Sequence, residues 1–202
     1  MFKLKIKYLE PDKLKIDSSF NNCEYQDESP KLELNDIKID ECSFKKIDFT
    51  NVNFHDVEFI DVLFEDCIIT NKNFDNMIFT RCIFNNCKLL GSSFCDSDIN
   101  GMQLNNAICS YCNFSGSKIK ELYINDSKLN ESSFIECELN KVFFNNVDFT
   151  KSEFNNTRLN NINFATCNIN NCDFDTNSIK GMIINRFQSE CIVSLLGIKF
   201  DD

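Results

Sequence analysis

The stretch S-F-K-K-I-D-F-T-N-V-N-F-H-D-V-E-F-I-D-V-L-F, residues 43–64, has a phenylalanine at nearly every fifth position. The same spacing of a large apolar residue, or once a cysteine, covers thirty positions from Ile39 to Ile184 and includes sixteen of the chain's twenty-one phenylalanines. A helix repeats every 3.6 residues and a strand every two, so neither produces a period of five. A fixed period over most of a chain is typical of a solenoid. A solenoid filled by its own side chains leaves no room for a conventional enzyme pocket, so we do not expect an enzyme.

Each five-residue unit has two inward positions. We call the periodic apolar residue the centre, the residue two before it the inward small position, and the residue two after it the corner position. Asn, Asp and Gly dominate the corner position, and these residues tolerate positive φ or form side-chain turns. The pattern therefore predicts short extended segments joined by tight corners. Lys72 breaks it with a charge at an inward small position, which we expect to reach the surface through a local bulge.

Most of the twelve cysteines follow the repeat. Reduced cysteine packs as a small hydrophobe, so their placement predicts packing rather than disulfides. The alternative is a metal or redox site at Cys67 and Cys87, which lie on adjacent coils, but we expect no cofactor. Cys95 is predicted to point outward as the most reactive thiol. The cysteines at inward small positions are Cys42, Cys67, Cys82, Cys87, Cys112, Cys137, Cys167 and Cys172.

Units such as C-N-F-S-G and S-E-F-N-N resemble the repeats of the pentapeptide-repeat family. This resemblance implies an all-β fold, a right-handed quadrilateral β-helix with one unit per side and four units per coil. About eight coils, at roughly 4.8 Å each, would form a rod on the order of 38 Å long. We expect an N-terminal cap with the first repeats and a short loop (1–33), the β-helix (34–186), and a C-terminal capping and dimerisation helix with a tail (187–202).

The five-residue register breaks at both ends of the β-helix. Upstream, centres at Phe20 and Tyr25 are one residue out of phase with Leu34, which predicts a projecting loop at Gln26–Lys31. Downstream, residues 187–198 predict a helix that ends at Gly197. Both features resemble the Qnr- and MfpA-type, topoisomerase-interacting branch of the family, in which the helix joins two rods end to end. The predicted dimer interface is Phe187, Cys191, Ile192, Leu195, Leu196, Ile198 and Phe200.

The formal net charge of −10 is concentrated on one side of the predicted rod. Centres twenty residues apart share a face, and we number the faces 1 to 4 by their first centres, Leu34, Ile39, Phe44 and Phe49. Faces 2 to 4 balance their charges, whereas the only basic residue of face 1 is Lys72. Corner preference and solubility explain single carboxylates but not this asymmetry. The acidic residues of face 1 are Glu33, Asp36, Asp56, Asp75, Asp96, Glu136, Glu153, Asp173 and Asp175.

The resemblance implies a non-enzymatic DNA mimic that binds a type II topoisomerase (DNA gyrase or topoisomerase IV) through face 1 and protects it from quinolones or modulates it. It implies a homodimer and no direct binding of nucleic acid. A second, longer loop found in Qnr proteins is missing, because the period is unbroken from Leu34 to Ile184.

The alternative function is a general interaction scaffold, which would use the apolar stripe on face 3. Because the sequence shows no signal peptide and no membrane-spanning apolar run, we expect a cytoplasmic protein. The stripe consists of Leu63, Ile83, Tyr123, Phe143 and Ile183.

Overall fold

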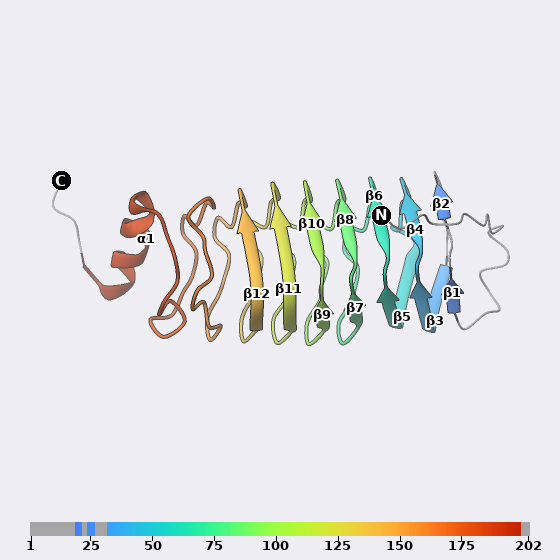
Figure 1. Cartoon of the computed structure of the whole chain (residues 1–202), viewed down its shortest axis with the longest axis horizontal. Coiled ribbons are helices and arrows are strands. Elements are labelled where there is room, and N and C mark those ends of the chain that lie inside the picture. The colour runs from blue at the N-terminus through green and yellow to red at the C-terminus, as the bar shows by residue number, and fades with distance from the viewer. Residues whose placement is uncertain (1–18, 22–23, 27–31, 199–202) are drawn as a thin grey trace.

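The protein is a rod of parallel β-strands that stack along its long axis, with a short helix at the C-terminal end (Figure 1). The computed structural model describes residues 19–21, 24–26 and 32–198. The strands are β1 (Ser19–Asn21), β2 (Glu24–Gln26), β3 (Leu32–Asp40), β4 (Ser43–Lys45), β5 (Val52–Ile60), β6 (Leu63–Glu65), β7 (Ile78–Thr80), β8 (Ile83–Asn85), β9 (Asp98–Asn100), β10 (Gln103–Asn105), β11 (Lys118–Asn125) and β12 (Glu138–Asn145). The predicted β-helix fold with a short C-terminal helix is confirmed.

The strands pair with a constant offset of twenty residues. Leu32 pairs with Val52, and the offset persists to the bridge between Asn163 and Ile183. The first coil is one residue shorter, because Phe20 pairs with Ile39. This confirms the predicted change of phase. Of the predicted loop, Gln26 still belongs to β2, and the other residues lie outside the described ones.

The centres fill the interior of the rod. On face 1 the phenylalanine rings stack almost parallel: the centroids of Phe94 and Phe114 are 4.9 Å apart with an interplanar angle of 4°, and those of Phe114 and Phe134 are 4.8 Å apart at 11°. All three rings are at most 1% exposed. Stacked rings add to the stabilisation that apolar burial supplies. The predicted phenylalanine column therefore forms a continuous stack of rings through the core.

Left-handed backbone conformations occur at the corner positions, as predicted. Asp36, Asp56 and Asp96 have φ values of 50°, 51° and 54°. The same region is occupied by residues that disfavour it, such as Tyr111 at 61°. The turning of the chain at each corner therefore requires a positive φ whatever residue is present. Asn, Asp or Gly at the corner lowers the energetic cost of that conformation.

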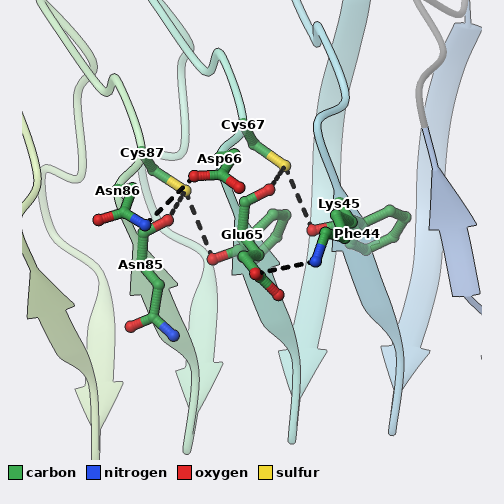
Figure 2. Close-up of polar contacts among 9 residues, drawn as sticks. Phe44, Lys45, Glu65, Asp66, Cys67, Asn85, Asn86 and Cys87 are labelled. Atoms are coloured by element: carbon green, nitrogen blue, oxygen red, sulfur yellow. Dashed lines mark hydrogen bonds and ion pairs between the residues drawn. The ribbon is translucent and has the colours of Figure 1, made fainter.

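The inward small position has a hydrogen-bonding function that spacing alone did not predict. Its hydroxyl or thiol donates to the backbone carbonyl twenty-three residues earlier, as in Ser97 Oγ to Phe74 O (2.8 Å) and Cys112 Sγ to Leu89 O (3.1 Å). Figure 2 shows the same arrangement for Cys67, whose Sγ lies 3.3 Å from the carbonyl oxygen of Phe44. Where Ser, Thr or Cys occupies this position, the side chain therefore both fills a small space and donates to the preceding coil, whereas Val, Met, Ala, Leu or Ile at the same position only packs.

Lys72 does not reach the surface, so the predicted path of its side chain is wrong, although the ladder beside it is locally disrupted. Its side chain is buried, and its ammonium donates to the carbonyls of Thr50 (2.8 Å) and Val52 (2.9 Å) in the preceding coil. Toward the next coil the ladder is kept, since Ser93 N donates to the Lys72 carbonyl, whereas toward the preceding coil the bonds Asn73 N to Val52 O and Phe54 N to Asn73 O are absent. Burial lowers the pKa of Lys72, and the charge of Asp48 opposes that shift. The ammonium takes the place of the usual short donor at this position.

The repeat is distorted once, in the last coil. Asn177 is at the inward small position by count, but it is exposed, and Ser178 is buried in its place. Asp175 drives this change, because its carboxylate accepts hydrogen bonds from the backbone of Asn156, Asn177 and Ser178 and from the Ser178 hydroxyl. These bonds, that from the Ser178 hydroxyl first, lower the pKa of Asp175. The unbroken period seen in the sequence therefore hides a one-residue shift in space.

A helical cap closes the C-terminal end. It comprises η2 (Arg186–Gln188), α1 (Ser189–Val193) and η3 (Ser194–Leu196), and it ends at Gly197 with a φ of 71°, as predicted. Asn185 and Gln188 form a capping box. The buried amide of Gln188 also donates to the carbonyls of Phe164 (2.9 Å) and Cys167 (2.7 Å). The cap thus satisfies backbone groups that the end of a solenoid leaves unpaired.

Candidate functional site

The nine predicted acidic residues lie on one side of the rod, on the outer positions of face 1. The structure leaves seven of them exposed, and Asp75 and Asp175 half-buried. Asp36, Asp56, Asp96 and Glu136 share the corner between faces 1 and 2, where positive φ turns each coil. The repeat therefore aligns carboxylates that are far apart in the sequence.

Cations that neutralise carboxylates are found on the other faces. Among the described residues, the Lys and Arg ion pairs are Lys38–Asp40, Arg81–Asp61 and Lys141–Glu121 on face 2 and Lys45–Glu65 on face 3. On face 1 the corresponding contact is between His55 and Glu33, at 3.8 Å. Because the only lysine of face 1, Lys72, turns its ammonium inward, the described surface of this face presents no Lys or Arg side chain. Because the Lys72 charge is buried, the exposed surface of face 1 is more negative, relative to the other faces, than the count of charged residues predicts.

Neutral donors hold several of these carboxylates in place. Glu33 accepts from Asn53 Nδ2 (2.7 Å), and Asp173 accepts from Asn155 Nδ2 (2.7 Å). Asp75 accepts from the backbone N–H of Cys95 at 2.9 Å. Hydrogen bonds of this kind orient a carboxylate and preserve its charge. Asp175 differs from the other eight acidic residues. Its hydrogen bonds within the turn to Asn177 and Ser178 give it a structural role that needs no binding partner.

The acidic surface is divided into two patches. The coil that contains Asn113 and Gly116 has no acidic residue on face 1. We call the two sides the N-terminal patch (Glu33, Asp36, Asp56, Asp75 and Asp96) and the C-terminal patch (Glu136, Glu153, Asp173 and Asp175). At roughly 4.8 Å per coil, Asp96 and Glu136 are about 10 Å apart along the rod. A partner would therefore meet two separate clusters of charge.

The cysteines of the repeat are packing residues and hydrogen-bond donors. Burial raises the pKa of the Cys82 thiol to about 12. The Cys67 and Cys87 thiols bond to backbone carbonyls of adjacent coils (Figure 2). Cys95 is half-buried rather than fully buried, and burial raises its pKa, which disfavours the predicted reactivity of this thiol. In the described part of the chain, no group of three or more His, Cys, Asp or Glu side chains is placed to hold a metal ion.

The predicted dimer residues divide into two sets. Ile192 and Leu195 pack against the core and are explained by capping. Phe187 and Ile198 are 93% and 53% exposed, which capping does not require. Cys191 is half-buried, its thiol 3.6 Å from Asn170 Oδ1, whereas the Leu196 side chain and Phe200 lie outside the described parts.

Among the described residues, no helix is long and apolar enough to cross a membrane.

Comparison with known families decides where the chain belongs. A family model described as a pentapeptide repeat region matches residues 57–134, and one described as pentapeptide repeats (8 copies) matches residues 127–164, so the two together cover more than half of the chain. The chain belongs to the pentapeptide-repeat family. No curated protein sequence matches it.

Solved structures with a similar fold include other pentapeptide-repeat proteins. QnrB1, a plasmid-mediated fluoroquinolone resistance protein, is 18% identical and aligns over 91% of this chain and 100% of its own, with a TM-score of 0.41. HetL, a pentapeptide-repeat protein involved in heterocyst differentiation regulation from the cyanobacterium Nostoc sp. strain PCC 7120, is 9% identical over 83% of this chain and 86% of its own, with a TM-score of 0.40. At these levels the likeness concerns the fold.

This pentapeptide-repeat protein also carries the predicted apolar stripe on face 3. The rings of Tyr123 and Phe143 stack with centroids 5.1 Å apart, and they are 38% and 54% exposed. Ile183 is 45% exposed, and Leu63 and Ile83 are half-buried. Gln103 and Asn163 interrupt the stripe on neighbouring coils. The exposed part is therefore an aromatic pair with isolated aliphatic residues rather than a continuous surface.

Proposed function

We propose that this protein acts without catalysis, by presenting face 1 as a substitute for DNA to a type II topoisomerase, either DNA gyrase or topoisomerase IV. The observation that supports this most is the absence of exposed Lys and Arg from the described part of face 1, together with its nine carboxylates. The sequence resemblance to the Qnr- and MfpA-type branch supplies the identity of the partner.

The physics of DNA binding explains why such a face would be recognised. Proteins that bind duplex DNA do so largely through cations that neutralise phosphates, so their affinity falls as salt rises. A narrow rod whose acidic face has no exposed Lys or Arg among its described residues offers these cations an alternative partner. The hydrogen bonds to Glu33, Asp75 and Asp173 fix the carboxylates before binding, which reduces the entropy lost in the complex.

Dimerisation through the C-terminal cap would extend this surface. The exposure of Phe187 and Ile198 at the end of the rod supports an end-to-end contact. Two rods of about eight coils would span roughly 75 Å, comparable to about 22 base pairs of DNA. Such a dimer would fit a topoisomerase, which holds a long segment of duplex.

Binding is proposed ahead of protection from quinolones. The β-helix register continues from Leu32 to Ile183 without an inserted loop, whereas Qnr proteins carry a second loop. We therefore expect modulation of the topoisomerase to be the primary effect, with the protein located where the topoisomerase acts, in the cytoplasm.

The test is a supercoiling assay with purified gyrase, with and without a quinolone, together with a binding measurement over a range of salt concentrations. A variant with Asp36→Lys, Asp56→Lys, Asp96→Lys and Glu136→Lys should lose binding while its circular dichroism is unchanged. A control with the same net charge reverses Glu58, Asp98, Glu138 and Asp126 on faces 2 and 3, and it should keep binding. If the wild-type protein has no effect at micromolar concentration, or the two variants behave alike, the proposal is wrong.

A second candidate function, a general interaction scaffold, is favoured by the exposed Tyr123–Phe143 pair. An aromatic pair on a flat sheet face suits the centre of a protein interface. In that case, Tyr123→Ser with Phe143→Ser would abolish partner binding, whereas the charge reversal on face 1 would not.

A further inference from the structure

The backbone ladder of the described residues is interrupted at two places. Beside Lys72 the bonds Asn51 N to Thr70 O, Phe54 N to Asn73 O, Asn73 N to Val52 O and Asp56 N to Asp75 O are absent, and the Lys72 ammonium joins the two coils instead. The longer interruption lies beside β12. On faces 1 and 4 the coil of residues 137–156 pairs normally with the next coil: Asn168 N donates to Val147 O (2.9 Å) and Phe154 N donates to Asp173 O (2.8 Å). On faces 2 and 3 none of the equivalent backbone bonds between these two coils is present among the described residues. The missing bonds are Arg158 N to Cys137 O, Leu139 N to Arg158 O, Lys141 N to Asn160 O, Asn163 N to Val142 O and Phe144 N to Asn163 O.

Equivalent bonds are present in neighbouring coils, so their absence is local. One coil earlier, Lys118 N donates to Ser97 O (3.0 Å) and Tyr123 N donates to Met102 O (2.9 Å). One coil later, Leu159 N donates to Ser178 O (3.0 Å) and Phe164 N donates to Ile183 O (2.8 Å). β12 consequently pairs with β11 alone and has one free edge. We call this interruption between residues 138–146 and 158–166 the seam.

Side chains at the seam are less well buried than elsewhere in the core. Leu139 is the centre of its unit but is only partly buried, whereas Ile119 and Leu159 on the flanking coils are 1% and 0% exposed. Val142 and Phe144 are each 7% exposed, compared with 0% for Leu122 and Ile124 one coil earlier. A surface groove of about 680 Å³ lies over this region, with Glu138, Leu139, Asn140 and Arg158 in its lining. The coils are thus loosely joined along two adjacent faces.

The last coil is distorted next to the seam. Ser178 occupies the inward position one residue late, so its hydroxyl accepts from Thr157 N, an offset of twenty-one residues where Ser152 and Ser132 use twenty. Asn161 N donates to Gly181 O, an offset of twenty residues where other corners use nineteen. Thr157 keeps the ordinary bonds to the coil before it, since Cys137 N donates to its Oγ1 (2.9 Å) and its hydroxyl donates to Phe134 O, so the seam begins after Thr157.

The residues beyond the seam are held together as one unit. The cap binds the first coil after the seam, through Gln188 to Phe164 and Cys167 and through Asn185 Nδ2 to Ala165 O (2.6 Å). Solenoid stability is the sum of the stabilities of single repeats and of nearest-neighbour interfaces. An array opens first at its weakest interface. The interruption at Lys72 is bridged by its ammonium, so the interface beside β12 is the weaker of the two.

We propose that the seam is a hinge, at which the C-terminal unit of residues 158–198 opens away from the rest of the rod on faces 2 and 3. The corner between faces 4 and 1, where pairing is complete, acts as the axis. Opening bends the rod toward that corner and changes the angle between the N-terminal patch and the C-terminal cap. The hinge concerns the isolated protein and does not depend on a topoisomerase partner; under the proposed function it would let the acidic face adapt to the curvature of a bound surface.

The test is site-resolved amide hydrogen exchange of the wild-type protein, followed by NMR. The amides of Leu139, Lys141 and Phe144 face the seam, and the matched controls are Ile119, Glu121 and Ile124, which face the paired ladder between β11 and β12. The seam amides should exchange at least tenfold faster than the controls, with Arg158 and Asn163 among the fast group. Equal protection of the two sets would overturn the hinge, whatever the supercoiling assay gives.

Limited proteolysis under native conditions supplies a second readout. Trypsin should cut after Lys141 or Arg158 before it cuts after Lys118 or Lys120, because only the former pair flanks the seam. A first cut within β11 would contradict the proposal.

Discussion

The hydroxyl of Ser152 donates a 2.6 Å hydrogen bond to the backbone carbonyl of Leu129 and accepts one of 3.1 Å from the backbone N–H of Ser132. One buried side chain thus joins two turns of the preceding coil. The same pair of bonds recurs along the rod at Ser92, Ser97, Ser117, Ser127 and Thr157.

Ser152→Ala should destabilise the protein by about 1–3 kcal/mol, because it leaves a buried donor and a buried acceptor without a partner. Ser152→Cys should cost less than half of that, since cysteine makes the same bond elsewhere, as Cys112 does. Urea denaturation followed by circular dichroism measures both. Similar losses for the two variants would show that volume, and not hydrogen bonding, decides this position.

Phe114→Ala should cost about 3–5 kcal/mol of unfolding free energy, because it leaves a cavity between Phe94 and Phe134. The matched control is Phe143→Ala, which removes an aromatic ring that is 54% exposed. The control should lose about 1 kcal/mol or less. A comparable loss in both variants would mean that the stacked phenylalanine column does not contribute more to stability than an exposed ring.

Gly116→Ala should destabilise more than Gly197→Ala, although both glycines have φ values above 70°. A Cβ at Gly116 would lie 2.2 Å from Asp96 Oδ1, whereas a Cβ at Gly197 would have nothing within 4 Å. We expect about 1 kcal/mol for Gly197→Ala, from the backbone alone, and a slightly larger loss for Gly116→Ala, because the exposed Asp96 side chain must also move away. Thermal denaturation of the two variants compares them, and equal shifts would contradict the expected clash.

Stability should fall as the pH rises above 9 under reducing conditions. Burial raises the pKa of Cys82, Cys137 and Cys172 to about 12, from an ordinary value of 9.0. Between these values the unfolded thiols lose protons that the folded thiols keep, so the folded state binds more protons and loses relative stability. At pH 10 each thiol contributes a loss of about 1.4 kcal/mol.

The control for this pH dependence replaces the three cysteines with serine, which does not ionise in this range. Denaturation from pH 7 to pH 10 should then show a smaller loss, by about 4 kcal/mol in total at pH 10. An unchanged slope in the triple variant would assign the alkaline loss to other groups.

Much of the fold was predictable because it depends on local spacing. A centre every fifth residue, a small residue two before it and Asn, Asp or Gly two after it were enough to place Phe114 in the core, Cys112 inside and Asp96 at a corner. The one-residue change of phase before Leu34 also appeared correctly as a shorter first coil. The acidic residues of face 1 were assigned to one side of the rod for the same reason, since a period of twenty residues follows from four units per coil.

Other features depended on which side chains meet across coils. The inward ammonium of Lys72, which clears face 1 of exposed Lys and Arg, requires the carbonyls of Thr50 and Val52 as partners. The exposure of Phe187 beside the buried Gln188 is decided by how the cap docks on the last coil.

By itself the sequence determined the repeat, the identity of the core residues and the face on which each charge lies. Each of these follows from a residue's place within the five-residue unit and within the twenty-residue coil. Only the tertiary structure decided where the ladder is closed and where it is open. Asp175 holds Ser178 inward in the last coil, and β12 pairs on one side only. No local period contains that information, because a hydrogen-bond ladder is a property of two neighbouring coils and not of either one alone.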